Sequence, residues 1–162
     1  FLETDLFNSG VRPAVNPGIS VSRVGSAAQI KAMKKVSGSL KLSYSQYREL
    51  QAFSQFGSDL DQDTKERLAK GERIVEVLKQ NRNAPMTVEH QVIVIYAVVN
   101  NFLREIPVKE ISDFEHALCT HVDETHPDII QSIRDTGDLT QETQAALDAV
   151  LRDFAAQYLS AQ

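Results

Sequence analysis

The segment 87-TVEHQVIVIYAVVNNFL-103 contains the most apolar part of this chain. Its centre, residues 92–99, is the longest unbroken apolar run in the sequence, and its many β-branched residues are also compatible with a buried strand. The run lies between Pro85 and Pro107, and a segment of that length suits a helix better than a strand. We therefore predict a helix that Thr87 caps, that runs to residue 103 and that is the most buried element.

Two helices are predicted in the first third of the chain. One covers residues 27–36 and is stopped by Gly38. The next begins at Ser43 and ends at Gly57, a residue type suited to a helix C-terminus. Its start carries a capping box and a hydrophobic staple, formed by Ser43 with Gln46 and by Leu42 with Tyr47.

Four more helical patterns flank the central stretch. Residues 62–79 form a helix capped by Asp61, in which Gly71 weakens the helix unless a neighbour packs closely there. After the central stretch, three helices are indicated by apolar spacing, by Pro127 at a first helical position, by Gly137 at a helix end and by Thr140 as a cap. Their inward residues are Val108, Ile111, Phe114, Leu118 and Val122, then Ile129, Ile130 and Ile133, then Leu147, Val150, Leu151, Phe154 and Tyr158.

Residues 1–25 differ from the rest, because two prolines and three glycines argue against a regular helix there. Residues 19–24 alternate apolar and polar side chains, which predicts a short strand. The predicted fold class is therefore mainly α: a C-terminal helical bundle, residues 26–162, preceded by a short extended segment, residues 1–25.

The composition is that of one globular domain, with 42% hydrophobic and 24% charged residues in 162. No apolar run approaches the about 20 residues of a membrane span, and no signal-peptide pattern is present. A single cysteine, Cys119, excludes an internal disulfide and fits a reducing compartment. Because the chain opens with Phe1 rather than methionine, we expect a piece of a longer chain.

The net charge of −5 conceals a strongly basic part. Residues 6–48 contain seven Lys and Arg residues and no Asp or Glu. Such a part suggests an anionic partner, namely phosphate, nucleic acid or an acidic protein face, although most basic runs are solvated surfaces. Nucleic acid is disfavoured, because the chain is acidic overall and lacks a helix-turn-helix or aromatic-platform pattern.

Familiar catalytic patterns are missing. No glycine opens the phosphate-binding pattern G-x-x-x-x-G-K-[ST], so we expect no nucleotide hydrolysis by this chain alone. Ser20 and Ser22 have no histidine near them in sequence, and we expect them to hydrogen-bond the local backbone. We expect no metal site, because the clustered histidines and thiol do not share one helix face. These residues are His116, Cys119, His121 and His126.

Arg23 closes a turn-rich segment that has no acid near it in sequence. A guanidinium is permanently charged and presents a planar fork of donors suited to phosphate oxygens. Arg23 could bind a phosphate group of another molecule, or it could form an ion pair with an acidic residue distant in the sequence. Composition alone favours the ion pair.

The segment 13-PAVNPGISVS-22 resembles the signature shared by the α and β subunits of rotary ATP synthases. The flanking residues 1–38, with QYRELQAFSQFGSDLD at 46–61 and LKQNRNAPMTVEHQ at 78–91, resemble the α subunit of the F-type enzyme. The resemblance covers the whole chain. It implies the C-terminal portion of a subunit roughly three times longer, in which residues 1–25 end the nucleotide-binding domain and a helical bundle follows.

The resemblance also implies roles for individual residues. Arg23 matches the arginine finger that reaches the catalytic site of the neighbouring β subunit, and Ser20 matches a position needed for activity. Arg12, Pro13 and Gln80 match positions around the base of the nucleotide in the α subunit's own non-catalytic site. At Arg82 the sequence departs from the glutamine usual in the family, and an arginine there could stack on the base instead.

The implied whole is a proton-translocating complex that makes or hydrolyses ATP. Its expected partners are β subunits in an alternating α/β hexamer, the central stalk γ subunit and the peripheral stalk, with no nucleic acid. ATP or ADP with Mg is expected in the full complex and no cofactor in this chain alone. The expected location is the cytoplasmic face of a bacterial cell membrane, without a membrane span. The alternative is a free-standing helical protein-interaction module, which co-purification with a β subunit would exclude.

Overall fold

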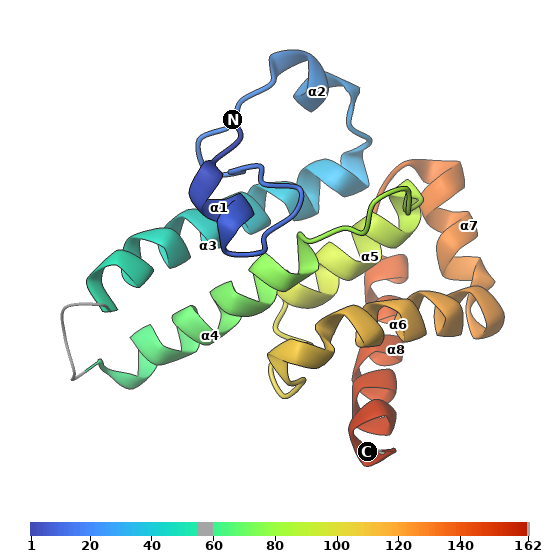
Figure 1. Cartoon of the computed structure of the whole chain (residues 1–162). Coiled ribbons are helices and arrows are strands. Elements are labelled where there is room, and N and C mark those ends of the chain that lie inside the picture. Colours follow the sequence, from blue (N-terminus) through green and yellow to red (C-terminus); the bar gives the residue numbers. More distant parts are fainter. Residues whose placement is uncertain (55–59, 162) are drawn as a thin grey trace.

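The computed structural model describes residues 1–52 in full, the backbone of residues 53 and 54, and residues 60–161. Within these ranges the chain is mainly α-helical, as predicted (Figure 1). The elements are α1 (Thr4–Asn8), α2 (Arg23–Ala28), α3 (Lys31–Ser54), α4 (Gln62–Val77), α5 (Val88–Val99), the 3-10 helix η1 (Val108–Glu110), α6 (Ile111–Thr125), α7 (Pro127–Thr136) and α8 (Gln141–Ser160).

Helix α5 is the most apolar element and lies in the core, which confirms the central prediction. The Thr87 hydroxyl accepts a hydrogen bond from the backbone N–H of His90 at 3.3 Å, so Thr87 is the N-cap. The helix ends at Val99, four residues earlier than predicted. Asn101 adopts a left-handed conformation with φ 65°, which a helix cannot contain, and Leu103 is still buried beyond that turn.

Helix α3 corrects the prediction of two helices in the first third of the chain. It runs without a break through Gly38, and Ser43 lies in its interior rather than at a start. A glycine in a helix interior costs only about 1 kcal/mol, and burial of Val36 and Leu40 on either side outweighs that cost. Leu42 is 61% exposed, so the predicted staple is not formed. Gly57 lies outside the described residues.

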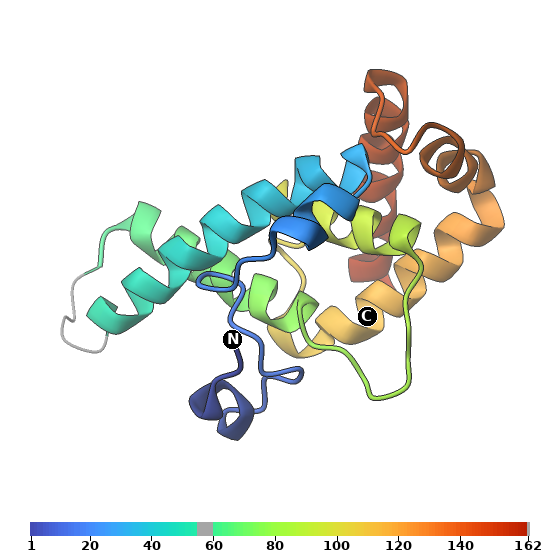
Figure 2. The ribbon, with the colours of Figure 1, turned by 90° about the horizontal axis from the view of Figure 1, so that it is seen from above.

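Helices α3 and α4 pack side by side (Figures 1 and 2), and at Gly71 they approach closely. A Cβ atom at Gly71 would lie 2.1 Å from Cδ2 of the Tyr47 ring. Tyr47 is therefore the closely packed neighbour that the sequence required at Gly71. Helix α4 begins as predicted, because the Asp61 side chain accepts from the N–H of Thr64 at 2.7 Å.

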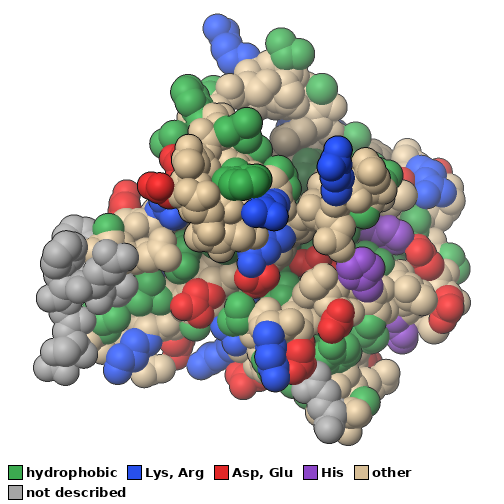
Figure 3. Space-filling model, in the orientation of Figure 1, with side chains coloured by type: hydrophobic (Ala, Val, Ile, Leu, Met, Phe, Trp, Pro, Cys, Tyr) green, Lys and Arg blue, Asp and Glu red, His purple; other side chains and the backbone are tan. Residues whose placement is uncertain are grey.

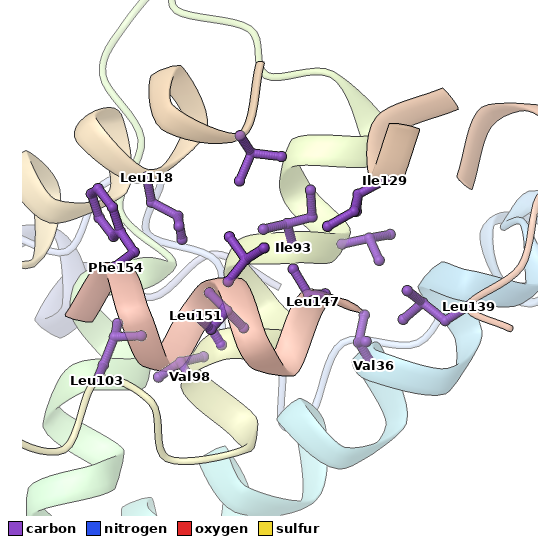
Figure 4. Close-up of a cluster of buried hydrophobic side chains, with 14 of the residues drawn as sticks. Val36, Ile93, Val98, Leu103, Leu118, Ile129, Leu139, Leu147, Leu151 and Phe154 are labelled. Atoms are coloured by element: carbon purple, nitrogen blue, oxygen red, sulfur yellow. The ribbon is translucent and has the colours of Figure 1, made fainter. Parts of the chain in front are cut away.

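The last two helices begin at the predicted signals, and α7 also ends at one. Pro127 is the first residue of α7, Gly137 ends it with φ 62°, and the Thr140 side chain accepts from the N–H of Thr143 to start α8. Side chains from five helices and two connections converge in the core (Figure 4): Val36, Ile93, Val98, Leu103, Leu118, Ile129, Leu139, Leu147, Leu151 and Phe154.

Residues 1–25 also differ from the prediction of an extended segment, because they include the short helix α1 and the first turn of α2. The strand predicted for residues 19–24 is absent, because Ser22 caps α2 by accepting from the N–H of Gly25 at 2.9 Å. A lone strand has no partner for its backbone groups, whereas a capped helical turn pairs some of them internally. In the described ranges the β pairing is limited to one isolated bridge between Leu2 and Val15.

Candidate functional site

A backbone hydrogen bond joins two of the predicted site segments. The N–H of Gln80, just after α4, donates to the carbonyl oxygen of Arg12 at 2.9 Å. The guanidinium carbon of Arg12 lies 4.2 Å from the centroid of the Phe7 ring, in a cation–π contact. The fold therefore places Arg12, Pro13 and Gln80 next to each other, although the segments are far apart in the chain.

A small apolar hollow lies beside this junction. Its volume is about 140 Å³, and Pro13 shares its wall with Val75 of α4, Leu78 directly after α4 and Tyr44 of α3. The Tyr44 hydroxyl is buried, and no described residue hydrogen-bonds it; burial also raises the pKa of Tyr44. Pockets for whole ligands measure roughly 300–1,000 Å³, so this hollow alone is too small for a nucleotide.

The loop after Gln80 is held by its own hydrogen bonds. The Gln80 side-chain amide donates to the carbonyl oxygen of Ala84 at 2.8 Å, and Asn83 takes a left-handed conformation with φ 60°. Arg82 is exposed in this loop. The structure thus places Arg82 in the same loop as Gln80 and leaves its guanidinium accessible to a ligand.

Arg23 is the first residue of α2, and every residue from 21 to 28 is exposed. No acidic side chain of the described residues pairs with its guanidinium. The described residues therefore do not support an ion pair between Arg23 and an acid distant in the sequence. Helix α2 stands at the edge of the molecule (Figure 1) and buries no residue of its own. The described residues therefore leave the Arg23 side chain exposed to solvent.

Ser20 and Ser22 bond the local backbone, as predicted from the sequence. The Ser20 hydroxyl donates to the carbonyl oxygen of Asn16, and the Ser22 hydroxyl caps α2. The Ser20 carbonyl oxygen also accepts from the ammonium of Lys41 at 3.1 Å, which ties the segment to α3.

The sequence profile of the family described as "ATP synthase alpha/beta chain, C terminal domain" matches residues 29–154. The chain belongs to this family. It is 55% identical over 159 residues to ATP synthase subunit alpha of Acetivibrio thermocellus and 56% identical over 158 residues to that of Caldanaerobacter subterraneus subsp. tengcongensis. Each match covers 98% of this chain and 31% of the relative.

A third relative, "ATP synthase subunit alpha, sodium ion specific" of Acetobacterium woodii, is 57% identical over 146 residues, or 90% of this chain and 29% of that protein. The chain thus spans about a third of the length of the curated relatives it matches, and it corresponds to their C-terminal part. The resemblance seen in the sequence is confirmed. Among the described residues, no helix is both long and apolar enough to cross a membrane.

The segment before the family match exposes several large apolar side chains, and separate groups of hydrophobic side chains are visible in the upper part of Figure 3. Monomeric proteins seldom expose large apolar patches, and such patches mark sites that interact with proteins, membranes or ligands. Two arginines, Arg12 and Arg23, are exposed on the same segment. The exposed apolar residues are Phe1, Leu2, Phe7, Val15, Ile19, Val21 and Val24.

The histidines and the thiol form no metal centre in the part of the chain that the structure describes. His121 stacks on the Phe154 ring with centroids 4.9 Å apart, and His116 is exposed. Burial, Glu115 and Asp123 raise the pKa of the Cys119 thiol to about 11, which makes it a poor nucleophile at neutral pH.

Sequence reasoning missed a buried carboxyl group, Glu115 of α6. The residue is 6% exposed, its Oε1 atom has no hydrogen-bond partner among the described residues, and burial together with Glu76 of α4 raises its pKa to about 8. The sequence contains a signal for this burial, because Glu115 lies at helical spacing between Ile111 and Leu118 and so falls on the apolar face of the helix.

Proposed function

We propose that this chain is the C-terminal part of the regulatory, non-catalytic α subunit of an F-type ATP synthase, and that Arg23 completes the catalytic site of a neighbouring β subunit. The observation that carries this role is the exposed guanidinium of Arg23 on α2, which has no described acidic partner and no buried neighbour in its helix. An arginine so placed is available to an anion on another subunit. Family membership and the exposed apolar segment around it support such a contact.

The chemistry follows from the guanidinium. In phosphoryl transfer, negative charge on the transferred group must be stabilised as the transition state forms. An arginine finger supplied from a partner is typically worth about 10³- to 10⁵-fold in rate. Lysine keeps the charge but loses the planar pair of donors that binds two oxygens at once. In this proposal Ser20 supports the site by holding the backbone that leads to Arg23.

Residues 1–25 end the nucleotide-binding domain in this proposal, and residues 26–162 form the C-terminal bundle. The family profile begins at residue 29, and the main core draws on residues from Ala32 onward, which supports this division. The backbone bond between Gln80 and Arg12 would then join the two domains.

The second proposed role is a nucleotide base site in the complete α subunit. Arg12, Pro13 and Gln80 adjoin one another, and Arg82 lies exposed on the same loop. ATP or ADP with Mg would bind there only once the rest of the subunit adds walls to the small hollow. We expect no ATP hydrolysis and no tight ATP binding by this chain alone. Turnover by the pure chain that is lost on mutating one of its own residues, or tight binding lost in Gln80→Ala, would overturn these expectations.

The proposed partners are β subunits in an alternating hexamer, the γ subunit of the central stalk and the peripheral stalk. The proposed location is peripheral, at the cytoplasmic face of a bacterial cell membrane, with protons as the coupled ion. Since one relative is described as sodium ion specific, ATP hydrolysis by the purified complex should be assayed with and without Na⁺. Stimulation by Na⁺ would overturn the proton assignment.

The experiment that tests the finger uses purified, fully assembled complex with Arg23→Lys or Arg23→Ala. Multisite ATP turnover should fall severely in both variants, while assembly and nucleotide binding at β persist. Arg152→Lys, at an exposed arginine of α8, is the matched control and should leave turnover unchanged. Near-normal turnover in Arg23→Lys would refute the assignment.

A further inference from the structure

A second hollow, independent of the proposed nucleotide site, lies at the opposite end of α4. It is an open groove of about 600 Å³ between the first three turns of α4 and the turn that follows α5. The small hollow beside Pro13 involves only the last turn of α4, so the two sites share no residue. Nothing in the proposed role of Arg23 uses this groove.

Two half-buried cations of α4 line the groove. The Lys70 ammonium donates to the carbonyl oxygen of Val99 at 2.6 Å. The Arg73 guanidinium donates to the carbonyl oxygens of Leu103 at 2.7 Å and Ala69 at 2.8 Å. These bonds use one of the three ammonium donors and two of the five guanidinium donors, so both cations retain donors.

No carboxylate among the described residues neutralises these two cations. The acids of the groove are held by arginines at its rim, because Asp63 pairs with Arg67 at 2.9 Å and Glu66 pairs with Arg104 at 3.2 Å. Glu105 also faces Arg104, at 3.6 Å. With Lys65 and the rim arginines included, the groove has five basic residues and three acidic ones.

Burial makes the charge on Lys70 costly. Loss of hydration is what lowers the pKa of Lys70, and the described residues offer it a neutral carbonyl oxygen rather than an anion. A negatively charged oxygen in the groove would offset the lost hydration and would form charge-assisted hydrogen bonds with the remaining donors.

We infer that this groove binds a small molecule through a phosphate-type oxyanion held by Lys70 and Arg73. The volume lies within the range of small-molecule pockets, roughly 300–1,000 Å³, so it exceeds what a single phosphate fills. Val98 and Leu103 also line the groove, but each is only 1% exposed, so the polar residues of α4 provide most of the accessible wall. The ligand class is therefore a phosphorylated small molecule that is larger than a single phosphate.

Inorganic phosphate and pyrophosphate are the probes for this site. The ¹⁵N-labelled 162-residue chain is titrated with each at constant ionic strength, and amide shifts are followed by NMR. Saturable shifts confined to residues 66–73 and 98–105 are expected. Linear shifts that never saturate, or shifts spread over many surface lysines, would overturn the site.

Charge-matched variants separate the groove from general attraction. Lys70→Gln retains an amide donor for the Val99 carbonyl and removes the charge, so binding should weaken about tenfold or more, since one charge-assisted hydrogen bond is worth about 1.5–3 kcal/mol. Arg73→Gln provides the same comparison independently if Lys70→Gln does not fold. Lys34→Gln, at an exposed lysine of α3, should change the affinity less than about twofold. Equal losses in the Lys34 and groove variants would refute the inference.

Discussion

Glu115 makes the stability of this domain depend on pH in a way that one substitution should remove. Its carboxyl group is buried on α6, lacks a partner for Oε1 among the described residues, and faces the Glu76 carboxylate of α4, whose own partner is Lys79. Burial and Glu76 raise the pKa of Glu115 from 4.5 to about 8 in the folded state. The folded chain therefore keeps this proton at neutral pH, whereas the unfolded chain releases it.

The sign follows from proton linkage. Between pH 4.5 and 8 the folded state binds more protons than the unfolded state, so the free energy of unfolding falls as pH rises. Each pH unit in this window is worth about 1.4 kcal/mol, so the penalty from Glu115 is about 1 kcal/mol at pH 5, about 3 at pH 7 and about 4 at pH 8. Below pH 4.5 the penalty vanishes, and above pH 8 it levels off.

Glu115→Gln replaces the protonated acid with a neutral group of similar shape. The amide can add a constant offset to stability, but it does not titrate, so the pH slope is the informative quantity. Urea unfolding at pH 5 and pH 8 should show the variant gaining about 3 kcal/mol relative to wild type between the two values. Glu124→Gln, at an exposed position of α6, should follow wild type. Parallel curves for wild type and Glu115→Gln would refute the reasoning.

Two further predictions test the packing. Gly71→Ala should destabilise the chain by about 1–3 kcal/mol in urea unfolding, because its Cβ would overlap the buried Tyr47 ring. Gly38→Ala, where a Cβ meets nothing within 4 Å, should stabilise the chain by about 1 kcal/mol. Equal effects of the two substitutions would contradict the close contact between Gly71 and Tyr47. With its pKa near 11, the Cys119 thiol should react with iodoacetamide at pH 8 about 100-fold more slowly than a free thiol; a rate like that of free cysteine would show the thiol to be accessible and ionised.

Local sequence signals predicted where α4, α5, α7 and α8 begin and where α7 ends. Thr87, Asp61 and Thr140 predicted helix starts, and Pro127 and Gly137 bounded α7, because capping depends on residues within one turn of each other. The family was also readable from the sequence, since residues 13–22 and their flanks are contiguous segments. Helix caps and contiguous motifs involve residues close together in the chain, so the sequence alone is enough to predict them.

The tertiary structure decided what depends on neighbours distant in the chain. Gly38 stays inside α3 because burial on both sides outweighs its local cost, and residues 19–24 form no strand because no described strand lies beside them. The proximity of Arg12 to Gln80 and the burial of Glu115 beside Glu76 likewise arise from helix packing. Hydration loss and long-range contacts are properties of the packed molecule, and a linear pattern does not contain them.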